Sequence, residues 1–393
     1  MGKKPLTLEE KRKLLKKTNE EIEKKFKIDT STFVSGNDME DVEFYPFGIA
    51  TLDNALGGGV GKGKQFEVYG EPSTGKSTVV LQLIANTLKN DPNATALYFD
   101  QEGAAATKQR MKDLGIDMDR FEYSGPGIAE QKLTAIKEKV KSGLFNIVVI
   151  DSTNFLVPEE EDTTTKGVNA TGGSMAEVAR LLSKFTRQMN GPLGENKTSL
   201  IYISQVRDNP NGYSRPGAPK PQSIGCGKAV GFAISQRLEL KKGEILTEGS
   251  GDDAIEVGRK VKFKVVKNKI TTPNIKGETV FTYAKGFDAE KDAEYFLYDE
   301  FVAQKNPAFV QLSKIKWQFT NPETGKVTEI KGKSHIIEDL KAAGEYEAAL
   351  NVAKMDAREK AKNTSSGSDF YNVSVSDVLG ESQEILETSD VED

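Results

Sequence analysis

The stretch Gly70-Glu-Pro-Ser-Thr-Gly-Lys-Ser77 decides the fold of this chain of 393 residues. It matches the phosphate-binding pattern G-x-x-x-x-G-K-[ST]. The context also fits, because a β-branched and aromatic run precedes the stretch and a helical pattern over 78–89 follows it. In such a loop the backbone N–H groups turn toward phosphates, and the N-terminus of the helix favours negative charge. The sequence therefore predicts a site for a nucleoside triphosphate.

The residue types in this stretch predict what individual side chains do at the bound nucleotide. We expect the ammonium of Lys76 to reach the β- and γ-phosphates and the hydroxyl of Ser77 to help hold Mg²⁺. A chance glycine turn is the alternative, and the strand before the loop and the helix after it argue against that. The predicted contacts to ATP in and beside the loop are Gly70, Glu71, Pro72, Ser73, Thr74, Gly75, Lys76, Ser77 and Thr78.

The run Asn146-Ile-Val-Val-Ile-Asp151 is an apolar segment that ends in a carboxylate. The pattern places Asp151 at the C-terminal edge of a buried strand, beside the phosphate loop. A carboxylate in that position can hold Mg²⁺ through water. Many buried strands end in aspartate by chance, so the pairing with the phosphate loop gives this residue its predicted role. ATP and Mg²⁺ are therefore the expected cofactors.

Two other strand tips carry candidates for the reaction. The run 97–103 carries Asp100 and Glu102 near its end, and two acids at a strand tip are costly unless they have partners or a function. We expect Asp100 to contact the nucleotide and Glu102 to orient and deprotonate the attacking water, with a helix N-cap acid as the alternative. The run 200–207 brings the amide of Gln205 to the same edge, where it could sense the γ-phosphate. A plain strand-terminal polar residue is the alternative there.

Strands and helices alternate along the middle of the chain, which indicates an α/β fold with a mostly parallel central sheet. The expected strands cover 65–69, 95–100, 146–151, 199–204, 237–241, 260–266 and 279–283. A helical pattern over 335–362 follows later. We expect four regions: an N-terminal helix and linker over 1–45, an ATPase core over 46–290, a smaller C-terminal α/β domain over 291–363 and a disordered acidic tail over 364–393.

Composition and charge exclude several kinds of protein. One cysteine and one histidine cannot form an intrachain disulfide or a zinc cage of cysteines and histidines. No apolar run reaches the roughly 20 residues that span a bilayer, and the N-terminus lacks the apolar core of a signal peptide. We therefore expect a cytoplasmic protein without membrane contact. Residues 1–27 hold ten basic and five acidic side chains, whereas 364–393 hold eight acidic and no basic ones, a pattern typical of interaction tails.

The motifs occur in an order that resembles the RecA family of recombinases: the phosphate loop, then Glu102, Asp151 and Gln205. The stretch Lys267-Asn-Lys269 is similar to a pair of lysines that reaches the ATP of the neighbouring subunit in this family. The resemblance covers roughly 46–290. It implies a DNA-dependent ATPase that forms filaments with ATP between protomers. The basic N-terminal helix then becomes the arm that packs on the next subunit.

Two stretches match the DNA-binding loops of the family in position. The first, 161–174, has glycines and no hydrophobic periodicity, and it enters a helix in which seven-residue spacing puts two arginines on one face. The second, 208–228, follows a predicted strand tip directly, which offers a route from the nucleotide state to DNA affinity. A disordered surface excursion is the alternative for either loop. The DNA-binding residues predicted in and beside these loops are Met175, Arg180, Arg187, Arg207 and Lys228.

The chain also departs from the pattern of the bacterial family members. Tyr283 matches an aromatic nucleotide contact made across the subunit interface, but the adenine-stacking tyrosine downstream of the catalytic glutamate is not obvious in 106–110. Both loops and the region after 291 differ as well, which a phage-encoded member would explain. The acidic tail resembles an inhibitory tail that competes with DNA for basic surface, with a plain solubilising terminus as the alternative.

We therefore expect a recombinase that forms filaments on single-stranded DNA, pairs it with homologous duplex and exchanges strands, with ATP hydrolysis stimulated by DNA. The expected partners are single- and double-stranded DNA, further copies of the chain, and loader and single-strand-binding proteins. A hexameric helicase or motor with the same core is the alternative enzyme, which the Lys267-Asn-Lys269 stretch disfavours. A non-catalytic ATP-dependent mediator is the alternative from another class, and Glu102 counts against it.

Overall fold

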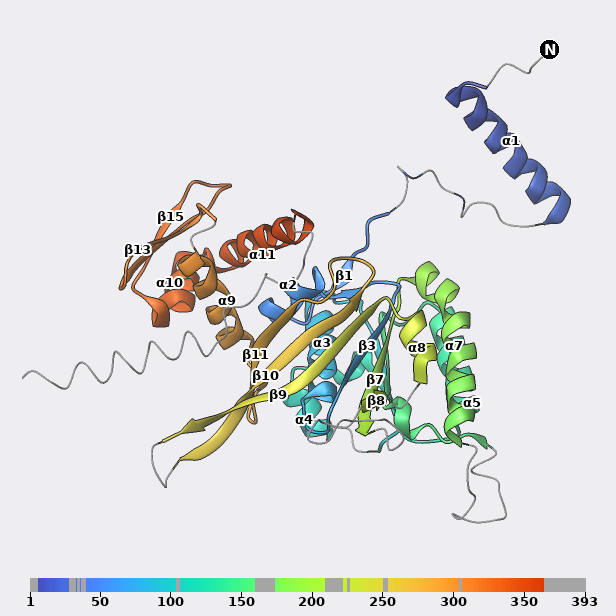
Figure 1. Ribbon diagram of the computed structural model, residues 1–393, viewed down its shortest axis with the longest axis horizontal. Helices are drawn as coiled ribbons and strands as arrows, with labels where there is room; N and C mark the ends of the chain where they lie inside the picture. The colour runs from blue at the N-terminus through green and yellow to red at the C-terminus, as the bar shows by residue number, and fades with distance from the viewer. Residues whose placement is uncertain are drawn as a thin grey trace, which may run out of the picture. The chain divides into compact units, whose positions relative to one another are not determined.

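The computed structural model describes most of the chain, and it falls into two compact units, 1–42 and 43–393 (Figure 1). The predicted acidic tail lies outside the described residues. The described residues are 6–27, 33, 36, 40–103, 107–159, 174–208, 222–224, 227–249, 254–303 and 306–363.

The first unit contains one helix, α1 (Leu8–Phe26), within its described residues. Thr7 begins the helix with a capping box, in which its side chain accepts from the N–H of Glu10 and the Glu10 carboxylate accepts from the N–H of Thr7. No residue of α1 is buried. Its apolar stripe is thin and includes the exposed side chains of Leu8, Leu14, Leu15 and Phe26.

The second unit is built on a central sheet that is mostly parallel where it carries the phosphate loop. Among the described residues its strand order is β12-β11-β10-β9-β3-β7-β6-β4-β5, with β8 paired to β7. The pairs from β9 through β3, β7, β6 and β4 to β5 are parallel, whereas β10, β11, β12 and β8 pair antiparallel. The predicted α/β class is confirmed. The strands are β3 (Gln65–Gly70), β4 (Ala96–Asp100), β5 (Phe121–Ser124), β6 (Ile147–Asp151), β7 (Ser199–Asp208), β8 (Gln222–Ile224), β9 (Gln236–Glu248), β10 (Ile255–Asn268), β11 (Lys276–Thr282) and β12 (Gly286–Phe287).

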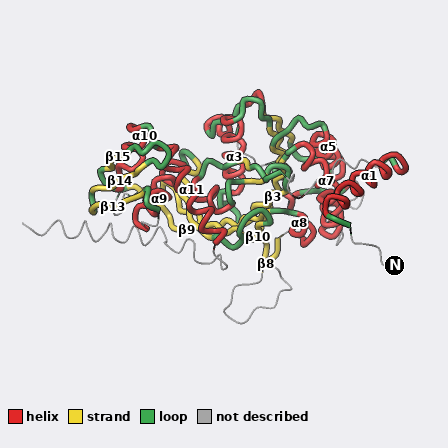
Figure 2. The backbone as a smooth tube through the Cα atoms, turned by 90° about the horizontal axis from the view of Figure 1, so that it is seen from above, coloured by secondary structure: helices red, strands yellow, loops and turns green. Residues whose placement is uncertain are grey.

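Helices cover both faces of this sheet. Successive strand residues point to opposite faces, so Val149 packs with the helix that follows the phosphate loop, while Val148 and Ile150 pack with the helices on the other side. Figure 2 shows two of the latter, α5 and α7, next to each other. The helices of this part are α2 (Ala50–Leu56), α3 (Lys76–Asn90), α4 (Lys108–Asp113), α5 (Ala129–Lys141), α7 (Ser174–Asn196) and α8 (Gly227–Ala233); short elements are β1 (Phe44–Tyr45), β2 (Val60–Gly61) and the 3-10 turns Met118–Arg120 and Thr153–Phe155.

The C-terminal part has its own core of aromatic and aliphatic side chains around Trp317. Two helices occupy the helical pattern predicted over 335–362. Gly344 adopts a left-handed conformation with φ of 72° and ends the first of them. The elements are α9 (Ala289–Ala303), β13 (Phe309–Ser313), β14 (Lys316–Thr320), β15 (Val327–Ile330), the 3-10 turn Lys333–His335, α10 (Ile336–Ala343) and α11 (Tyr346–Asn363). Across the described residues, the structure contains no helix with the length and apolar character of a membrane span.

Candidate active site

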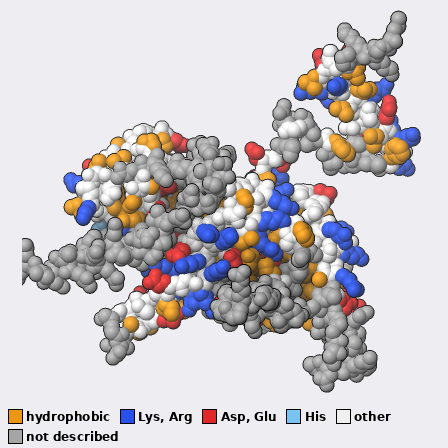
Figure 3. Space-filling view, in the orientation of Figure 1, with side chains coloured by type: hydrophobic (Ala, Val, Ile, Leu, Met, Phe, Trp, Pro, Cys, Tyr) orange, Lys and Arg blue, Asp and Glu red, His pale blue; other side chains and the backbone are white. Residues whose placement is uncertain are grey.

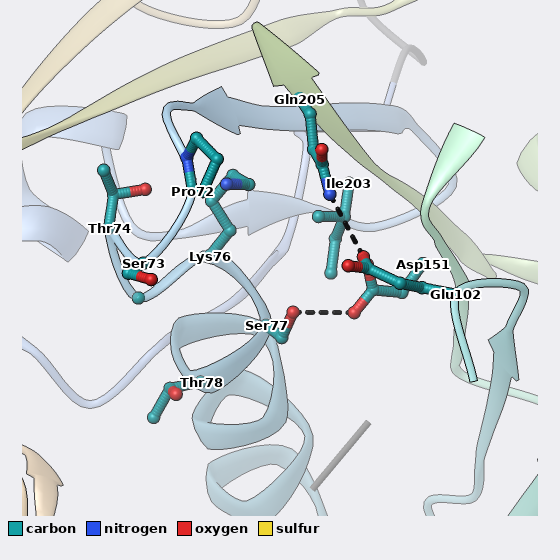
Figure 4. Close-up of a pocket in the computed structure, with 11 residues that line it drawn as sticks. Pro72, Ser73, Thr74, Lys76, Ser77, Thr78, Glu102, Asp151, Ile203 and Gln205 are labelled. Atoms are coloured by element: carbon teal, nitrogen blue, oxygen red, sulfur yellow. Dashed lines mark hydrogen bonds between the residues drawn. The ribbon is translucent and has the colours of Figure 1, made fainter. Parts of the chain in front are cut away.

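A cavity of about 290 Å³ opens where the C-terminal ends of β6 and β7 meet the loop between β3 and α3 (Figure 4). This is the edge of a parallel sheet at which α/β proteins bind ligands. The phosphate-loop residues form one wall, and side chains from the neighbouring strand ends form the other. The described lining residues are Pro72, Ser73, Thr74, Gly75, Lys76, Ser77, Thr78, Glu102, Asp151, Ile203 and Gln205.

The loop owes its shape to a few backbone positions. Gly75 has φ of 88° and precedes the first residue of α3, so the free N–H groups of the first helical turn face the cavity side. Gly70 has no room for a side chain, since a Cβ there would lie 2.3 Å from the carbonyl oxygen of Leu240. Gly70 and Glu71 complete the loop without lining the cavity. The loop therefore has the geometry of an anion-binding turn.

Lys76 is held against the loop. Its Nζ donates to the carbonyl oxygen of Glu71 at 2.7 Å. Burial is the largest cause that lowers the pKa of Lys76, and the carboxylates of Asp151 and Glu102 oppose that shift. The ammonium is thus placed among acidic groups at the centre of the cavity wall, where it can meet phosphate oxygens.

Asp151 and Ser77 meet at the floor of the cavity. The hydroxyl of Ser77 donates to Oδ2 of Asp151 at 2.7 Å, and the hydroxyl of Tyr98 donates to the same oxygen at 2.5 Å. Burial raises the pKa of Asp151, whereas these two hydrogen bonds lower it. The peptide bond between Asp151 and Ser152 is cis.

A hydroxyl and a carboxylate are the hard oxygen donors that Mg²⁺ prefers. Within the described residues, the chain contains no cluster of three or more His, Cys, Asp or Glu side chains that could cage a metal. The pair Ser77 and Asp151 therefore fits an ion that takes its remaining ligands from phosphates and water, as Mg²⁺ does in phosphate-loop sites.

Glu102 and Gln205 face the phosphate loop from the opposite wall (Figure 4). Nε2 of Gln205 donates to Oε2 of Glu102 at 3.2 Å, and Asn154 accepts from the backbone N–H of Gln205 at 2.9 Å. Partial burial raises the pKa of Glu102, and the negative charge of Asp151 adds to that shift. A carboxylate with a raised pKa is a better base toward water than an unperturbed one.

Asp100 lies beside this cavity but is not one of its lining residues. The side chain is only 1% exposed. Its Oδ1 accepts from the N–H of Gly103 at 2.8 Å, and its Oδ2 accepts from the hydroxyl of Tyr123 at 2.9 Å. In the structure Asp100 shapes the turn that carries Glu102, and its predicted contact with the nucleotide stays a prediction.

The three residues expected to act on the ATP of the neighbouring subunit lie outside the cavity of their own chain. Nζ of Lys267 donates to the carbonyl oxygen of Gly231 at 2.8 Å, and Nζ of Lys269 donates to that of Phe232 at 3.4 Å. Both carbonyls belong to α8, so the two ammonium groups lie together at its C-terminal end. Tyr283 is 48% exposed and donates its hydroxyl to the carboxylate of Glu256.

The predicted DNA contacts are described only in part. Arg180 and Arg187 lie on α7 with exposed side chains, seven residues apart. Met175 belongs to α7, Arg207 to β7 and Lys228 to α8, but their side chains lie outside the described residues. So do most of the two predicted loops. Figure 3 shows further Lys and Arg side chains over the strands β9 to β11.

A buried ion pair behind the site was not foreseen from the sequence. Glu67 lies in the middle of β3, fully buried, and its Oε2 accepts from Arg237 of β9 at 2.6 Å. Its Oε1 accepts from the hydroxyl of Ser204 at 2.7 Å, and Ser204 is 3.0 Å from the hydroxyl of Thr153. The network joins β3, β7, β9 and the 3-10 turn Thr153–Phe155 that follows β6. An acid between apolar residues in a predicted strand is the signal that could have indicated it.

The fold and this cavity define the class of the protein: a phosphate-loop nucleotide-binding protein with a mostly parallel sheet. The family model for the RecA N-terminal domain matches residues 13–288. The chain therefore belongs to the RecA family of recombinases, as the order of its motifs indicates. The recombinase interpretation is confirmed, and the helicase and mediator alternatives are not favoured.

Similar proteins come from several bacteria. Protein RecA of Bifidobacterium longum (strain NCC 2705) is 31% identical over 358 residues, which cover 87% of this chain and 86% of the relative. The plasmid protein RecA of Lactococcus lactis subsp. lactis is 32% identical over 285 residues, 72% of this chain and 78% of the relative. Protein RecA of Mycoplasmopsis pulmonis (strain UAB CTIP) is 34% identical over 275 residues, 70% of this chain and 77% of the relative.

Proposed function

We propose that this recombinase binds ATP with Mg²⁺ in the cavity between the phosphate loop and the ends of β6 and β7, and hydrolyses it when bound to DNA. One observation supports this most: Glu102 and Gln205 form a hydrogen-bonded pair opposite Lys76 and Ser77, across a cavity lined by both sets. A γ-phosphate on the loop would lie between them. Family membership adds support, since RecA-family proteins use ATP with Mg²⁺.

The chain's own groups supply the chemistry of hydrolysis. Lys76 and the N–H groups of the first turn of α3 hold the β- and γ-phosphates and stabilise charge that develops on them. Ser77 and Asp151 hold Mg²⁺, which when bound neutralises phosphate charge. Glu102 takes a proton from the attacking water as its oxygen bonds to the γ-phosphorus, and the bond from that phosphorus to the β–γ bridging oxygen breaks, which leaves ADP and phosphate. Its raised pKa, caused mainly by burial, suits that role.

Gln205 is proposed to couple the nucleotide to DNA. Its amide lies at the cavity, and its strand β7 continues only to Asp208 before the second predicted DNA-binding loop. A γ-phosphate competes with Glu102 for the amide donor of Gln205, because both offer anionic oxygens. A shift of this side chain would move the start of the loop. This is a short physical route between ATP state and DNA affinity.

Neighbouring protomers are proposed to complete the nucleotide site. Lys267, Lys269 and Tyr283 do not reach the cavity of their own chain, so a role at ATP requires a second copy. Two ammonium groups held 2.8 and 3.4 Å from α8 carbonyls form a compact positive centre. Supplied in trans, such a centre stabilises transition-state charge as an arginine finger does. Helix α1, with its exposed apolar stripe, is the proposed arm between protomers.

Filaments of this kind would hold single-stranded DNA, pair it with homologous duplex and exchange strands. Arg180 and Arg187 are proposed to follow the phosphate backbone, together with Met175, Arg207 and Lys228. Backbone contacts make binding largely tolerant of sequence and sensitive to salt. Loader and single-strand-binding proteins are the further partners we propose, and the cytoplasmic location stays a prediction.

ATP hydrolysis with and without single-stranded DNA tests the proposal. Wild type should hydrolyse ATP faster with DNA, and electron microscopy of the same mixtures should show filaments. Glu102→Gln should lose turnover by at least about 100-fold, the usual contribution of a general base, and keep long-lived filaments. Glu122→Gln, which changes an exposed acid on β5, is the matched control and should behave as wild type.

Three results would contradict the proposal. Turnover that is indifferent to DNA would remove the role assigned to Gln205 and the loops. Rings in place of filaments would favour a motor with the same core. Full activity in Glu102→Gln would assign the base to another group.

A further inference from the structure

Two described side chains donate hydrogen bonds to the Asp151 carboxylate, and both donate to the same oxygen, Oδ2. Ser77 reaches Oδ2 from the cavity side, whereas Tyr98 reaches it from within the sheet. Tyr98 does not line the cavity, and its side chain is fully buried. The phenol therefore reaches the site through the Asp151 carboxylate and the Ser77 hydroxyl beside it, rather than by lining the cavity.

The sheet register places the phenol where it is. Tyr98 on β4 pairs with Val149 on β6, and Asp151 lies two residues further along β6. Residues two apart in a strand share a face, so the long tyrosine side chain extends along the sheet to the carboxylate. Its ring packs near Phe121, with 6.3 Å between the ring centroids. The surrounding core holds the ring in place, and the position of the ring determines where its hydroxyl lies.

We propose that Tyr98 is a positioning residue for Mg²⁺, acting through Asp151. This rests on the proposed function, in which Asp151 and Ser77 hold the ion. Because the phenol donates to Oδ2, the carboxylate cannot rotate freely about its own axis. Oδ1 would then be the oxygen left to accept from water on the ion. The Ser77 hydroxyl donates to the same Oδ2, which would leave the lone pairs of its oxygen available to the ion.

The same arrangement occurs one strand away and provides a comparison within the chain. Tyr123 on β5 pairs with Tyr98, and its hydroxyl donates to Asp100, two residues beyond Tyr98 on β4. Each tyrosine thus donates a hydrogen bond to the aspartate that ends the neighbouring strand of the sheet. The difference lies in what each aspartate faces, because Asp151 lines the cavity and Asp100 does not. Only the Tyr98 pair should affect the ion.

Nucleotide affinity at different Mg²⁺ concentrations tests the inference without requiring turnover. The probe is a fluorescent ATP analogue, titrated into wild type, Tyr98→Phe and Tyr123→Phe, first in EDTA and then at increasing Mg²⁺. Tyr98→Phe loses a hydrogen bond to a charged group. It should therefore need about tenfold more Mg²⁺ than wild type for half-maximal binding. Affinity in EDTA should stay at the wild-type value, because the phosphate loop is unchanged. Tyr123→Phe should follow wild type throughout.

The outcomes separate three cases. Mg²⁺ dependence in Tyr98→Phe that equals wild type would overturn the inference. Weaker binding by the same factor in EDTA and in Mg²⁺ would also overturn it, because a merely structural role of the phenol predicts that result. If wild type bound the analogue no better with Mg²⁺ than without, the metal role proposed for Asp151 would fail, and the inference with it. Retained binding in EDTA shows that the variant is folded.

Discussion

Replacing Arg237 by methionine should destabilise the sheet beneath the nucleotide site strongly. The substitution keeps an unbranched side chain of similar length and removes the guanidinium. In the wild type this group donates to Glu67 through Nε, with Nη2 also 2.6 Å from the same carboxylate oxygen. The guanidinium also lies over the ring of Tyr69, 5.3 Å from its centroid. All of these contacts are lost together.

The size of the effect follows from the burial of the partner. Glu67 is fully buried, and without Arg237 its carboxylate keeps the hydroxyl of Ser204 among the described hydrogen bonds. Breaking a buried ion pair by removing one partner costs about 3–5 kcal/mol. An exposed pair, such as Lys139 with Glu122 at 2.6 Å, is worth about 0–1 kcal/mol. Lys139→Met is therefore the matched control.

Urea unfolding of wild type, Arg237→Met and Lys139→Met measures these differences. Glu67→Gln combined with Arg237→Met should recover part of the loss, because a buried amide costs less than a buried carboxylate that has lost its guanidinium partner. A loss in Arg237→Met no larger than in Lys139→Met would refute the reasoning. No recovery in the double variant would show that packing, rather than charge, explains the loss.

Three further predictions concern separate features. Gln205→Ala should keep ATP binding and lose most DNA stimulation of hydrolysis, measured as the ratio of rates with and without DNA; an unchanged ratio would exclude the sensor role. Gly70→Ala should lose binding of an ATP analogue at least about tenfold, since its Cβ would lie 2.3 Å from Leu240 O; wild-type affinity would contradict this. Burial raises the pKa of Asp299 from 3.8 to about 7, so its contribution to stability is present below about pH 4 and is lost as pH rises through 7. Melting temperature should fall from pH 5 to pH 8, and less so in Asp299→Asn; parallel profiles would count against this.

The central part of the fold could be predicted from the sequence because its signals are local. Short apolar runs that end in polar residues indicate parallel strands, and the phosphate-loop pattern fixes one strand and one helix. The strands β9 and β10 extend beyond the ranges predicted for them, 237–241 and 260–266. Residues such as Lys242 and Glu248 belong to β9 through cross-strand pairing, although the alternation of apolar and polar residues around them is weak. The strands β13–β15 escaped prediction because, unlike β4 and β6, they are not fully buried apolar runs.

The candidate site was predictable where one strand tip carries one polar residue. Asp151, Glu102 and Gln205 line one cavity with the phosphate loop because the ends of parallel strands share an edge. Contacts between strands were not predictable. The hydroxyl of Tyr98 reaches Asp151 only through the order and register of β4 and β6, and neither can be read from either segment alone.

Mixing two inactive variants tests most directly whether neighbouring protomers share the ATP site. Lys76→Ala removes the phosphate-loop ammonium, and Lys269→Ala removes the one proposed to act in trans. Each should be inactive alone, yet mixed filaments with single-stranded DNA should regain ATP hydrolysis, with a maximum near equal amounts, because some interfaces then carry both intact groups. Recovery would establish a site completed by the neighbour. No recovery at any ratio, in mixtures that still form filaments, would contradict it.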